Sequence, residues 1–296
     1  MFFSVIIPTY NRADMLRETL ESVFAQTFED YEVIVVDDGS TDHTVEILRG
    51  YPRVKVLTQT NRGPGAARNH GVSRSSGQYL AFLDSDDLWF PWTLGVYQQV
   101  ALQHASPGFI TGTPLVFTTD AKLPGTRDKD VSVESLADYY ASSDNWHWFG
   151  TPTFVIRKDV FLAVGGFQEK GGMEDAHLAM KLGCSPGFVH IQQPQTFAYR
   201  NHVNSLKDEL NYQFSGAMLL ITSERNGDFP GGPTRARERW RILTRHIRPV
   251  MLECLKRGRR REAWDLYRAT FSWHLRLGRW KCLAGFPLMA LFGKAR

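Results

Sequence analysis

The chain has 296 residues, of which 43% are hydrophobic and 22% charged, so it can bury a full core as one large α/β domain or as one domain with a smaller annex. This length and composition exclude a small disulfide-stapled fold and a wholly disordered chain. Three widely spaced cysteines without a CxxC pair argue against a disulfide framework and against a cysteine zinc site.

Charge is divided unevenly along the chain. Residues 1–232 hold 18 Lys and Arg against 27 Asp and Glu, a net charge of −9, whereas residues 233–296 hold 17 against 4, a net charge of +13. The net charge of +4 is therefore the sum of an acidic body and a basic tail. Such a tail suits a polyanion, and an acidic body needs a cation if it is to hold a phosphate.

The N-terminal apolar run, residues 1–8, has no basic leader and is too short for a signal peptide, which predicts a cytoplasmic protein. Strand and helix signals then alternate, which is typical of a mostly parallel central sheet flanked by helices in an α/β fold. Apolar runs predict the strands, and helical periodicity with capping residues predicts the helices. Strands are expected at 3–7, 31–36, 54–57, 79–83, 109–117 and 153–156, and helices at 11–26, 40–48, 64–72, from 91, and at 174–182.

The regular alternation is interrupted once and then ends. Residues 118–150 lose periodicity and carry charges, which predicts an insertion or lid. After residue 205 the chain turns helical and basic. The sequence therefore predicts a catalytic α/β domain over residues 1–205 and a helical basic extension over residues 206–296.

Two acidic clusters follow predicted strands. Asp37 and Asp38 close the second strand, and Asp84, Asp86 and Asp87 close the fourth. Ligands of open α/β sheets bind beyond the carboxyl ends of the strands. Carboxylates gathered there raise one another's pKa unless a cation neutralises them, so these acids indicate Mg²⁺ or Mn²⁺ with a phosphate-bearing substrate. Either cluster alone is also good turn and helix-cap chemistry, but their joint placement favours the cation site.

Four ordered motifs resemble those of family 2 inverting glycosyltransferases with the GT-A fold. They are VIIPTYN at 5–11, VVDDGSTD at 35–42, FLDSDD at 82–87 and the pair Glu174-Asp175. Any one would be weak evidence, whereas four in the right order are specific. The resemblance implies transfer of a sugar from a nucleotide-sugar donor, for which a UDP-sugar is the preferred candidate. The acceptor would be a hydroxyl of a glycan or of a lipid-linked molecule, in polysaccharide or cell-envelope synthesis.

The resemblance also implies a nucleotide pocket. Pro8 and Tyr10 would line the base, and Asp38 would accept a hydrogen bond from the uracil ring while Asp37 orients it. Arg68, in the segment GPGAARN, would reach the nucleotide or its diphosphate.

The DSDD element is implied to serve the ribose and the metal. Asp84 would hold the ribose or a water beside the metal, Asp86 would ligate Mn²⁺ or Mg²⁺, and Asp87 could share either task. His202 resembles a histidine that adds a metal ligand in some relatives, although a lone histidine is more often a surface residue.

Asp175 is implied to be the catalytic base, with Glu174 helping to place the acceptor. Inversion needs a base on one face of the anomeric carbon and a stabilised leaving group on the other. A first helical turn favours the ionised carboxylate, and the same position also suits two acids that merely complement the helix dipole. Trp146 and Trp148 could stack on an acceptor sugar or pack beneath a loop.

The basic tail, residues 233–296, also carries four tryptophans and ends in an apolar stretch at 282–292. This stretch is too short to cross a bilayer but can lie in the interface of an anionic leaflet. It predicts peripheral attachment at the inner face of the plasma membrane; a helical annex that packs on the catalytic domain or makes a homo-oligomer contact is the alternative. The run of arginines at 257–261 has no nucleic-acid motif beside it, so no nucleic acid is expected.

Three other functions are open to the same pattern. A Rossmann oxidoreductase is suggested by the glycines at 63 and 65, but the third glycine is missing. A sugar nucleotidylyltransferase needs a glycine-rich basic loop after its first strand, where this chain has PTYN. A non-enzymatic binding module would depend on the tail alone and would leave the acidic strand ends unexplained.

Overall fold

The computed structural model describes residues 1–117, 127, 129–143, 145, 150–169, 171–201 and 209–292. The chain forms two compact units. The first, called the sheet unit, comprises Met1–Tyr139, Trp146–Lys170 and Ser185–Val203, and the second, called the helical unit, comprises Tyr140–Asn145, Gly171–Cys184 and Asn204–Arg296.

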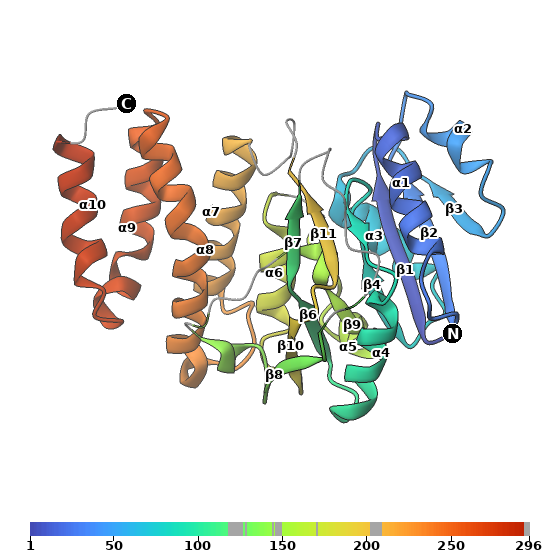
Figure 1. Ribbon diagram of the computed structural model, residues 1–296. Coiled ribbons are helices and arrows are strands. Elements are labelled where there is room, and N and C mark those ends of the chain that lie inside the picture. Colours follow the sequence, from blue (N-terminus) through green and yellow to red (C-terminus); the bar gives the residue numbers. More distant parts are fainter. Residues whose placement is uncertain are drawn as a thin grey trace. The chain divides into compact units, whose positions relative to one another are not determined.

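The sheet unit is built on an eight-stranded sheet with the order β3-β2-β1-β4-β9-β6-β10-β8 (Figure 1). Four neighbouring pairs are parallel, and the three that involve β9 or β8 are antiparallel. The predicted mostly parallel α/β sheet is therefore confirmed. Its strands are β1 (Phe3–Thr9), β2 (Tyr31–Asp37), β3 (Val54–Thr58), β4 (Tyr79–Phe82), β6 (Phe109–Gly112), β8 (Ser132–Leu136), β9 (Val155–Arg157) and β10 (Phe188–Gln193).

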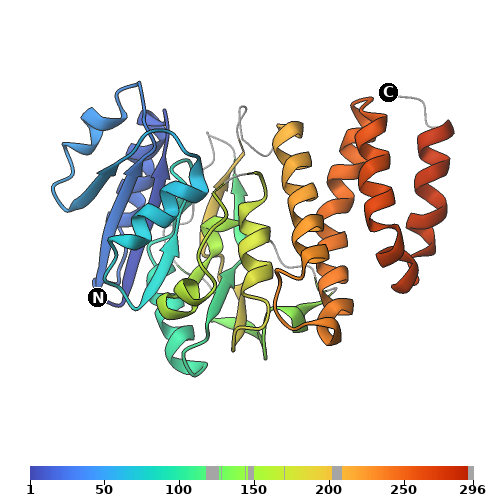
Figure 2. The same cartoon turned by 180° about the vertical axis from the view of Figure 1, so that it is seen from behind.

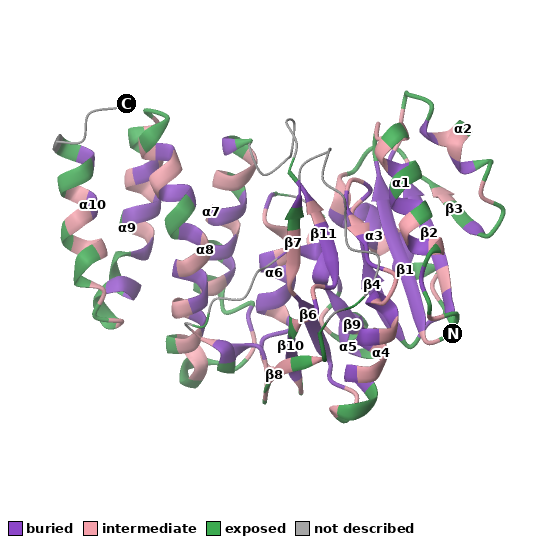
Figure 3. Ribbon diagram, viewed as in Figure 1, coloured by how far each residue is buried: buried purple, intermediate pink, exposed green. Residues whose placement is uncertain are grey.

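Helices cover both faces of the parallel part of this sheet. Successive side chains of a strand point to opposite faces, so alternate residues enter different cores. Val5 of β1 is buried with Leu16 of α1, whereas Ile34 and Val36 of β2 are buried with Ala67 of α3. Figure 2, seen from behind, presents the α3 side of β1 and β2, and Figure 3 shows these strands almost entirely buried. The helices are α1 (Ala13–Phe24), α2 (Thr44–Leu48), α3 (Pro64–Ser73), α4 (Thr93–Gln103) and α5 (Lys158–Ala163).

The single strand predicted at 109–117 is two strands in two sheets. β6 ends at Gly112, and β7 (Pro114–Phe117) belongs to a three-stranded sheet of order β5-β11-β7, with β5 at Leu88–Trp89 and β11 at Phe197–Arg200. The chain changes sheets at Thr113, whose hydroxyl donates to the Ile191 carbonyl at 2.8 Å. Local apolarity does not reveal such a change, because both strands are apolar.

The region predicted as an insertion, residues 118–150, contributes a strand. β8 pairs antiparallel with β10 at the edge of the large sheet. Its sequence, SVESL, is only half-buried, which is why no strand was expected there. Residues 118–126 and 146–149 lie outside the described residues, and a lid role for this region stays a prediction.

The helical unit contains α6 (Glu174–Lys181), α7 (Leu210–Asn226), α8 (Ala236–Lys256), α9 (Arg260–Arg276) and α10 (Trp280–Phe292). The last four run side by side in chain order (Figure 1), and consecutive ones contact each other. Glycines 227, 258 and 278 follow α7, α8 and α9 with positive φ, the conformation that lets a helix end sharply. In the described part of the chain, no helix is both long enough and apolar enough to span a membrane.

Candidate active site

The carboxyl ends of β1, β2 and β4 lie at one edge of the sheet because the three strands are adjacent and parallel. The loops after them carry the predicted motifs. Asn11 ties two of these loops together, because its Oδ1 accepts the backbone N–H of Thr41 at 2.8 Å and its own N–H donates to the Ser40 hydroxyl at 2.9 Å. The sequence motif alone does not reveal this role of Asn11, whose φ is positive at 51°.

Asp38 is buried and holds the loop after β3. One carboxylate oxygen accepts the Gln59 amide at 2.8 Å and the Arg62 backbone N–H at 2.9 Å, and the other accepts the Gly63 N–H at 2.8 Å. These bonds orient the carboxylate beside the start of α3. A hydrogen bond to a uracil ring stays a prediction.

The other residues predicted to bind the nucleotide near Asp38 differ in solvent exposure. Asp37 is buried at the end of β2 and accepts the Ser40 N–H at 3.1 Å. Pro8 is buried within β1, whereas the Tyr10 side chain is 46% exposed on the following loop. Of these three, Tyr10 has the accessible ring that stacking on a base needs.

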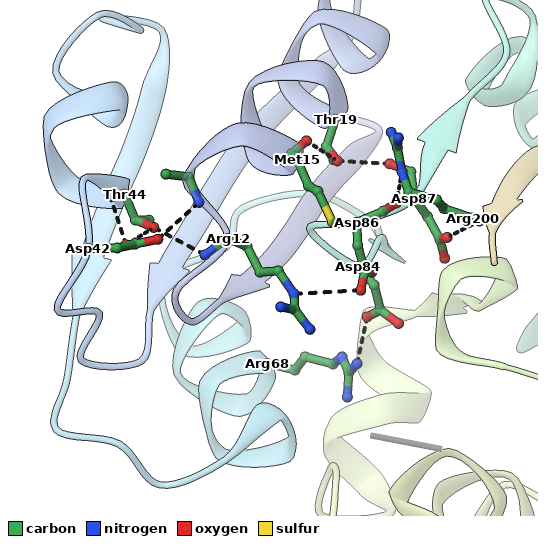
Figure 4. Close-up of polar contacts among 11 residues, drawn as sticks. Arg12, Met15, Thr19, Asp42, Thr44, Arg68, Asp84, Asp86, Asp87 and Arg200 are labelled. Carbon is green, nitrogen blue, oxygen red and sulfur yellow. Dashed lines mark hydrogen bonds and ion pairs between the residues drawn. The ribbon is translucent and has the colours of Figure 1, made fainter. Parts of the chain in front are cut away.

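Asp84, Asp86 and Asp87 gather after β4. One carboxylate oxygen from each lies within 4.8 Å of the others, so the three can offer a shared set of ligand atoms (Figure 4). Burial, and then the charges of Asp86 and Asp84, raise the pKa of Asp87 well above its usual range. Three carboxyl groups are therefore crowded at this loop, and oxygen ligands of this type suit Mg²⁺ or Mn²⁺.

Two arginines from other segments approach the cluster (Figure 4). Arg68 of α3 is buried, and its Nη2 lies 2.6 Å from Asp84 Oδ1. Arg12, after β1, brings its Nε to 3.9 Å from Asp86 Oδ2. Arg68 was predicted to reach the nucleotide; that role stays a prediction, and the structure shows its guanidinium beside Asp84.

Arg200, at the end of β11, is a residue that the sequence analysis did not assign. Its backbone N–H donates to Asp87 Oδ1 and its Nε donates to the Asp86 carbonyl, each at 2.9 Å. Its Nη2 forms a 2.5 Å ion pair with Glu18 of α1. Because Arg200 is buried, it fixes the backbone that carries the two acids. No local signal could identify it, since the contact spans more than a hundred residues.

Glu174 and Asp175 belong to the helical unit, at the start of α6. Asp175 Oδ1 accepts the N–H of Ala176 at 2.6 Å, and Glu174 Oε2 accepts the hydroxyl of Tyr212 at 2.7 Å. The preceding Met173 has a left-handed φ of 57°, which turns the chain sharply into the helix. The predicted metal ligand His202 and the predicted acceptor residues Trp146 and Trp148 lie outside the described residues.

Comparison with known proteins identifies the family. The sequence profile of "Glycosyl transferase family 2" matches residues 4–160. An uncharacterized glycosyltransferase of Haemophilus influenzae is 31% identical over 206 residues, which cover 66% of this chain and 67% of the relative. Two other curated glycosyltransferases are matched over only 13% and 30% of their own length.

Solved structures agree on the fold. A crystal structure of Staphylococcus aureus TarS in complex with UDP has a TM-score of 0.66 at 23% identity, covering 91% of this chain and 81% of that one. Mannosyltransferase PcManGT from Pyrobaculum calidifontis, in complex with GDP-Man and Mn²⁺, has a TM-score of 0.54 at 19% identity, covering 99% and 87%. The expected GT-A fold is thereby confirmed, and the match of the family profile to more than half of the sequence shows that the chain belongs to glycosyl transferase family 2.

Proposed function

We propose that this glycosyltransferase moves a sugar, with inversion, from a nucleoside diphosphate sugar to a hydroxyl of a glycan or lipid-linked acceptor. The convergence of Asp84, Asp86 and Asp87 beside the buried Arg68 carries this proposal. A UDP-sugar is the first choice of donor, because TarS structures contain UDP and UDP-GlcNAc and because the motif that holds Asp38 resembles one that contacts a uracil ring.

The three aspartates fit a divalent cation. They supply hard oxygen atoms within 4.8 Å of one another. Burial is the main cause of the raised pKa of Asp87, and the neighbouring charges of Asp86 and Asp84 add to it; a cation would offset that added repulsion. Mn²⁺ or Mg²⁺ held there would stabilise the negative charge of the departing nucleoside diphosphate. PcManGT contains Mn²⁺, which supports the choice of metal.

Side chains of the protein would bind the nucleotide, accept the proton and position the acceptor. Tyr10 would stack on the base and Asp38 would orient it, while Arg68 would share the diphosphate charge with the cation. Asp175, in its carboxylate form, would accept the proton of the acceptor hydroxyl as that oxygen attacks the anomeric carbon. Glu174, fixed by the Tyr212 hydroxyl, would position the acceptor.

Titration calorimetry with UDP, GDP and dTDP, each with and without Mn²⁺, tests the donor site. We expect Mn²⁺-dependent binding of at least one nucleoside diphosphate, with UDP bound most tightly. A donor-hydrolysis screen over a panel of nucleotide sugars then identifies the sugar. Absence of any metal-dependent nucleotide binding by the folded protein would refute the proposal.

The base is tested separately. Asp175→Asn should abolish transfer while it leaves the calorimetric affinity for the donor unchanged, because the amide is the same size but accepts no proton. Near-normal turnover by this variant would mean that another residue is the base.

A further inference from the structure

The helical unit contains an open groove that the proposed active-site chemistry does not use. It has a volume of about 1060 Å³ and is lined by the second half of α8, the end of α9 with the turn that follows it, and residues along α10 from Trp280 to Met289. Figure 1 shows these three helices side by side. A groove this large can hold the head and part of the chains of an amphiphilic ligand.

The groove wall is strongly cationic. Among the lining residues there are five basic side chains and one acid, Glu253. Like charges brought together repel one another unless an anion compensates them. The basic residues are Arg245, Arg248, Lys256, Arg279 and Lys281.

Two of these cations are available to a ligand. Arg248 and Lys281 are exposed, and neither forms a hydrogen bond or an ion pair within the described part of the chain. Arg279 instead donates to the Thr244 hydroxyl at 2.6 Å, which fixes one side of the groove. The charge pattern therefore fits an anionic headgroup bound at Arg248 and Lys281.

Large apolar side chains are exposed at the same place. Trp280 and Met289 line the groove and are 65% and 46% exposed, and Leu288 and Leu291 continue the apolar surface of α10 at 58% and 65%. Figure 3 shows exposed residues along α10. Cations beside exposed tryptophan and aliphatic side chains match the boundary between headgroups and acyl chains, and a helix of 13 residues is too short to do more than lie in it.

We propose that this groove docks the helical unit on an anionic phospholipid leaflet. Arg248 and Lys281 bind lipid phosphates, while Trp280 and the apolar residues of α10 enter the acyl boundary. The inference narrows the predicted membrane contact from residues 233–296 to one groove. It does not depend on the nature of the sugar or on catalysis.

Flotation of the full chain with vesicles tests the docking. We expect binding to phosphatidylcholine vesicles that contain phosphatidylglycerol and little binding to pure phosphatidylcholine. Each basic side chain near an anionic surface raises the partition coefficient about fivefold, so the double variant Arg248→Glu/Lys281→Glu should lower it by more than about 25-fold. Equal binding of the wild-type protein to both vesicle types would overturn the proposal.

A control variant distinguishes lipid binding by the groove from nonspecific attraction of the basic protein to the vesicle. Arg237→Glu/Arg261→Glu changes the net charge by the same amount, at two exposed residues of the helical unit that do not line the groove. It should lower the partition coefficient much less than the groove variant does. An equal loss would show nonspecific attraction and would contradict a defined groove.

Tryptophan quenching tests the insertion. Brominated acyl chains should quench the wild-type protein, and Trp280→Phe should remove a measurable part of this quenching while flotation is retained. Unchanged quenching would mean that Trp280 stays outside the acyl boundary and would overturn the proposed geometry.

Sedimentation velocity tests whether a second copy of the chain occupies the groove instead of lipid. If the wild-type protein is a dimer, and the groove variant dissociates it while vesicle binding is unchanged, the groove serves self-association and the proposal is overturned.

Discussion

Arg68 and Asp84 form an ion pair at the edge of the acidic cluster, although one comes from α3 and the other follows β4 (Figure 4). The Nη2 to Oδ1 distance is 2.6 Å, and the arginine side chain is 4% exposed while the aspartate is 32% exposed. The Arg68 guanidinium also lies 5.2 Å from the centroid of the Phe167 ring. One cation thus neutralises part of a three-carboxylate loop and ties it to a helix.

Replacing Arg68 should therefore destabilise the sheet unit. Arg68→Met removes the cation that lies 2.6 Å from Asp84, next to two other acids, and we expect a loss of about 2 to 4 kcal/mol in the free energy of unfolding. Urea unfolding measures this loss. Asp84→Asn in the same background should restore part of the stability, giving a coupling of about 1 to 3 kcal/mol; additive effects would mean that the pair does not interact.

Mn²⁺ should stabilise the protein in the presence of UDP. At a ligand concentration about 100 times Kd, binding adds about 2.7 kcal/mol, which corresponds to a rise of about 5 to 10 °C in Tm. Asp86→Asn removes a carboxylate from the cluster and should abolish the Mn²⁺-dependent part of this rise. Asp14→Asn, at an exposed aspartate of α1 outside the cluster, should keep it.

Tyr212 should matter for transfer because it fixes Glu174 through a 2.7 Å hydrogen bond. Tyr212→Phe removes only the hydroxyl, so we expect kcat/KM for the acceptor to fall by about tenfold with donor binding unchanged. Initial-rate kinetics at varied acceptor concentration measure this effect. Glu174→Gln should produce a similar loss, and the double variant should lose little more, since both changes break one contact. Fully multiplicative losses would contradict a positioning role for Tyr212.

The helical unit should lose stability as the pH falls from 6.5 to 4. Burial, followed by nearby positive charge, lowers the pKa of His177 and His274 to about 4, below the ordinary value of 6.5. In the acid range the unfolded chain binds protons that the folded protein does not, so the contribution of each neutral histidine is present above about pH 6.5 and is lost on acidification. We expect about 1 to 3 kcal/mol for each histidine.

Urea unfolding between pH 4 and 7.5 tests this dependence. His177→Gln should flatten the profile, whereas His43→Gln, at a side chain that is 85% exposed, should leave its shape unchanged. A profile that is identical in the wild-type protein and in His177→Gln would rule out His177 as a source of acid lability.

Helix α7 packs closely against the loop that precedes α6. A single added methyl group at this contact should therefore lower the free energy of unfolding. A Cβ at Gly216 would lie 2.4 Å from the Gly172 carbonyl oxygen, a backbone atom that cannot move aside easily. Gly216→Ala should cost about 2 kcal/mol or more in unfolding free energy. Gly285→Ala, where a Cβ meets nothing within 4 Å, should instead stabilise α10 by up to about 1 kcal/mol. Equal effects at both positions would show that the contact is absent.

Local sequence determines much of this protein. The apolar runs ending at Pro8, Asp37 and Leu83 predict three neighbouring strands, because a buried parallel strand must be apolar on both faces. The four ordered motifs resemble those of family 2 glycosyltransferases, and the match of the family profile confirms this assignment. The alternation of strand and helix predicts parallel strands with their carboxyl ends at one edge of the sheet. Asp38, Asp84 and Asp86 follow β2 and β4, which lie on either side of β1 at that edge.

Other features of the site, the sheets and the groove depend on the tertiary structure. Arg200 reaches Asp86, Asp87 and Glu18 from a strand more than a hundred residues away from any of them, and the strand predicted at 109–117 divides between two sheets. Likewise, the groove beside Arg248 exists because α8 and α10 both pack against α9. Hydrophobic periodicity reports only which face of each element is buried, whereas these features depend on which elements meet, and that is set by packing across long separations in the chain.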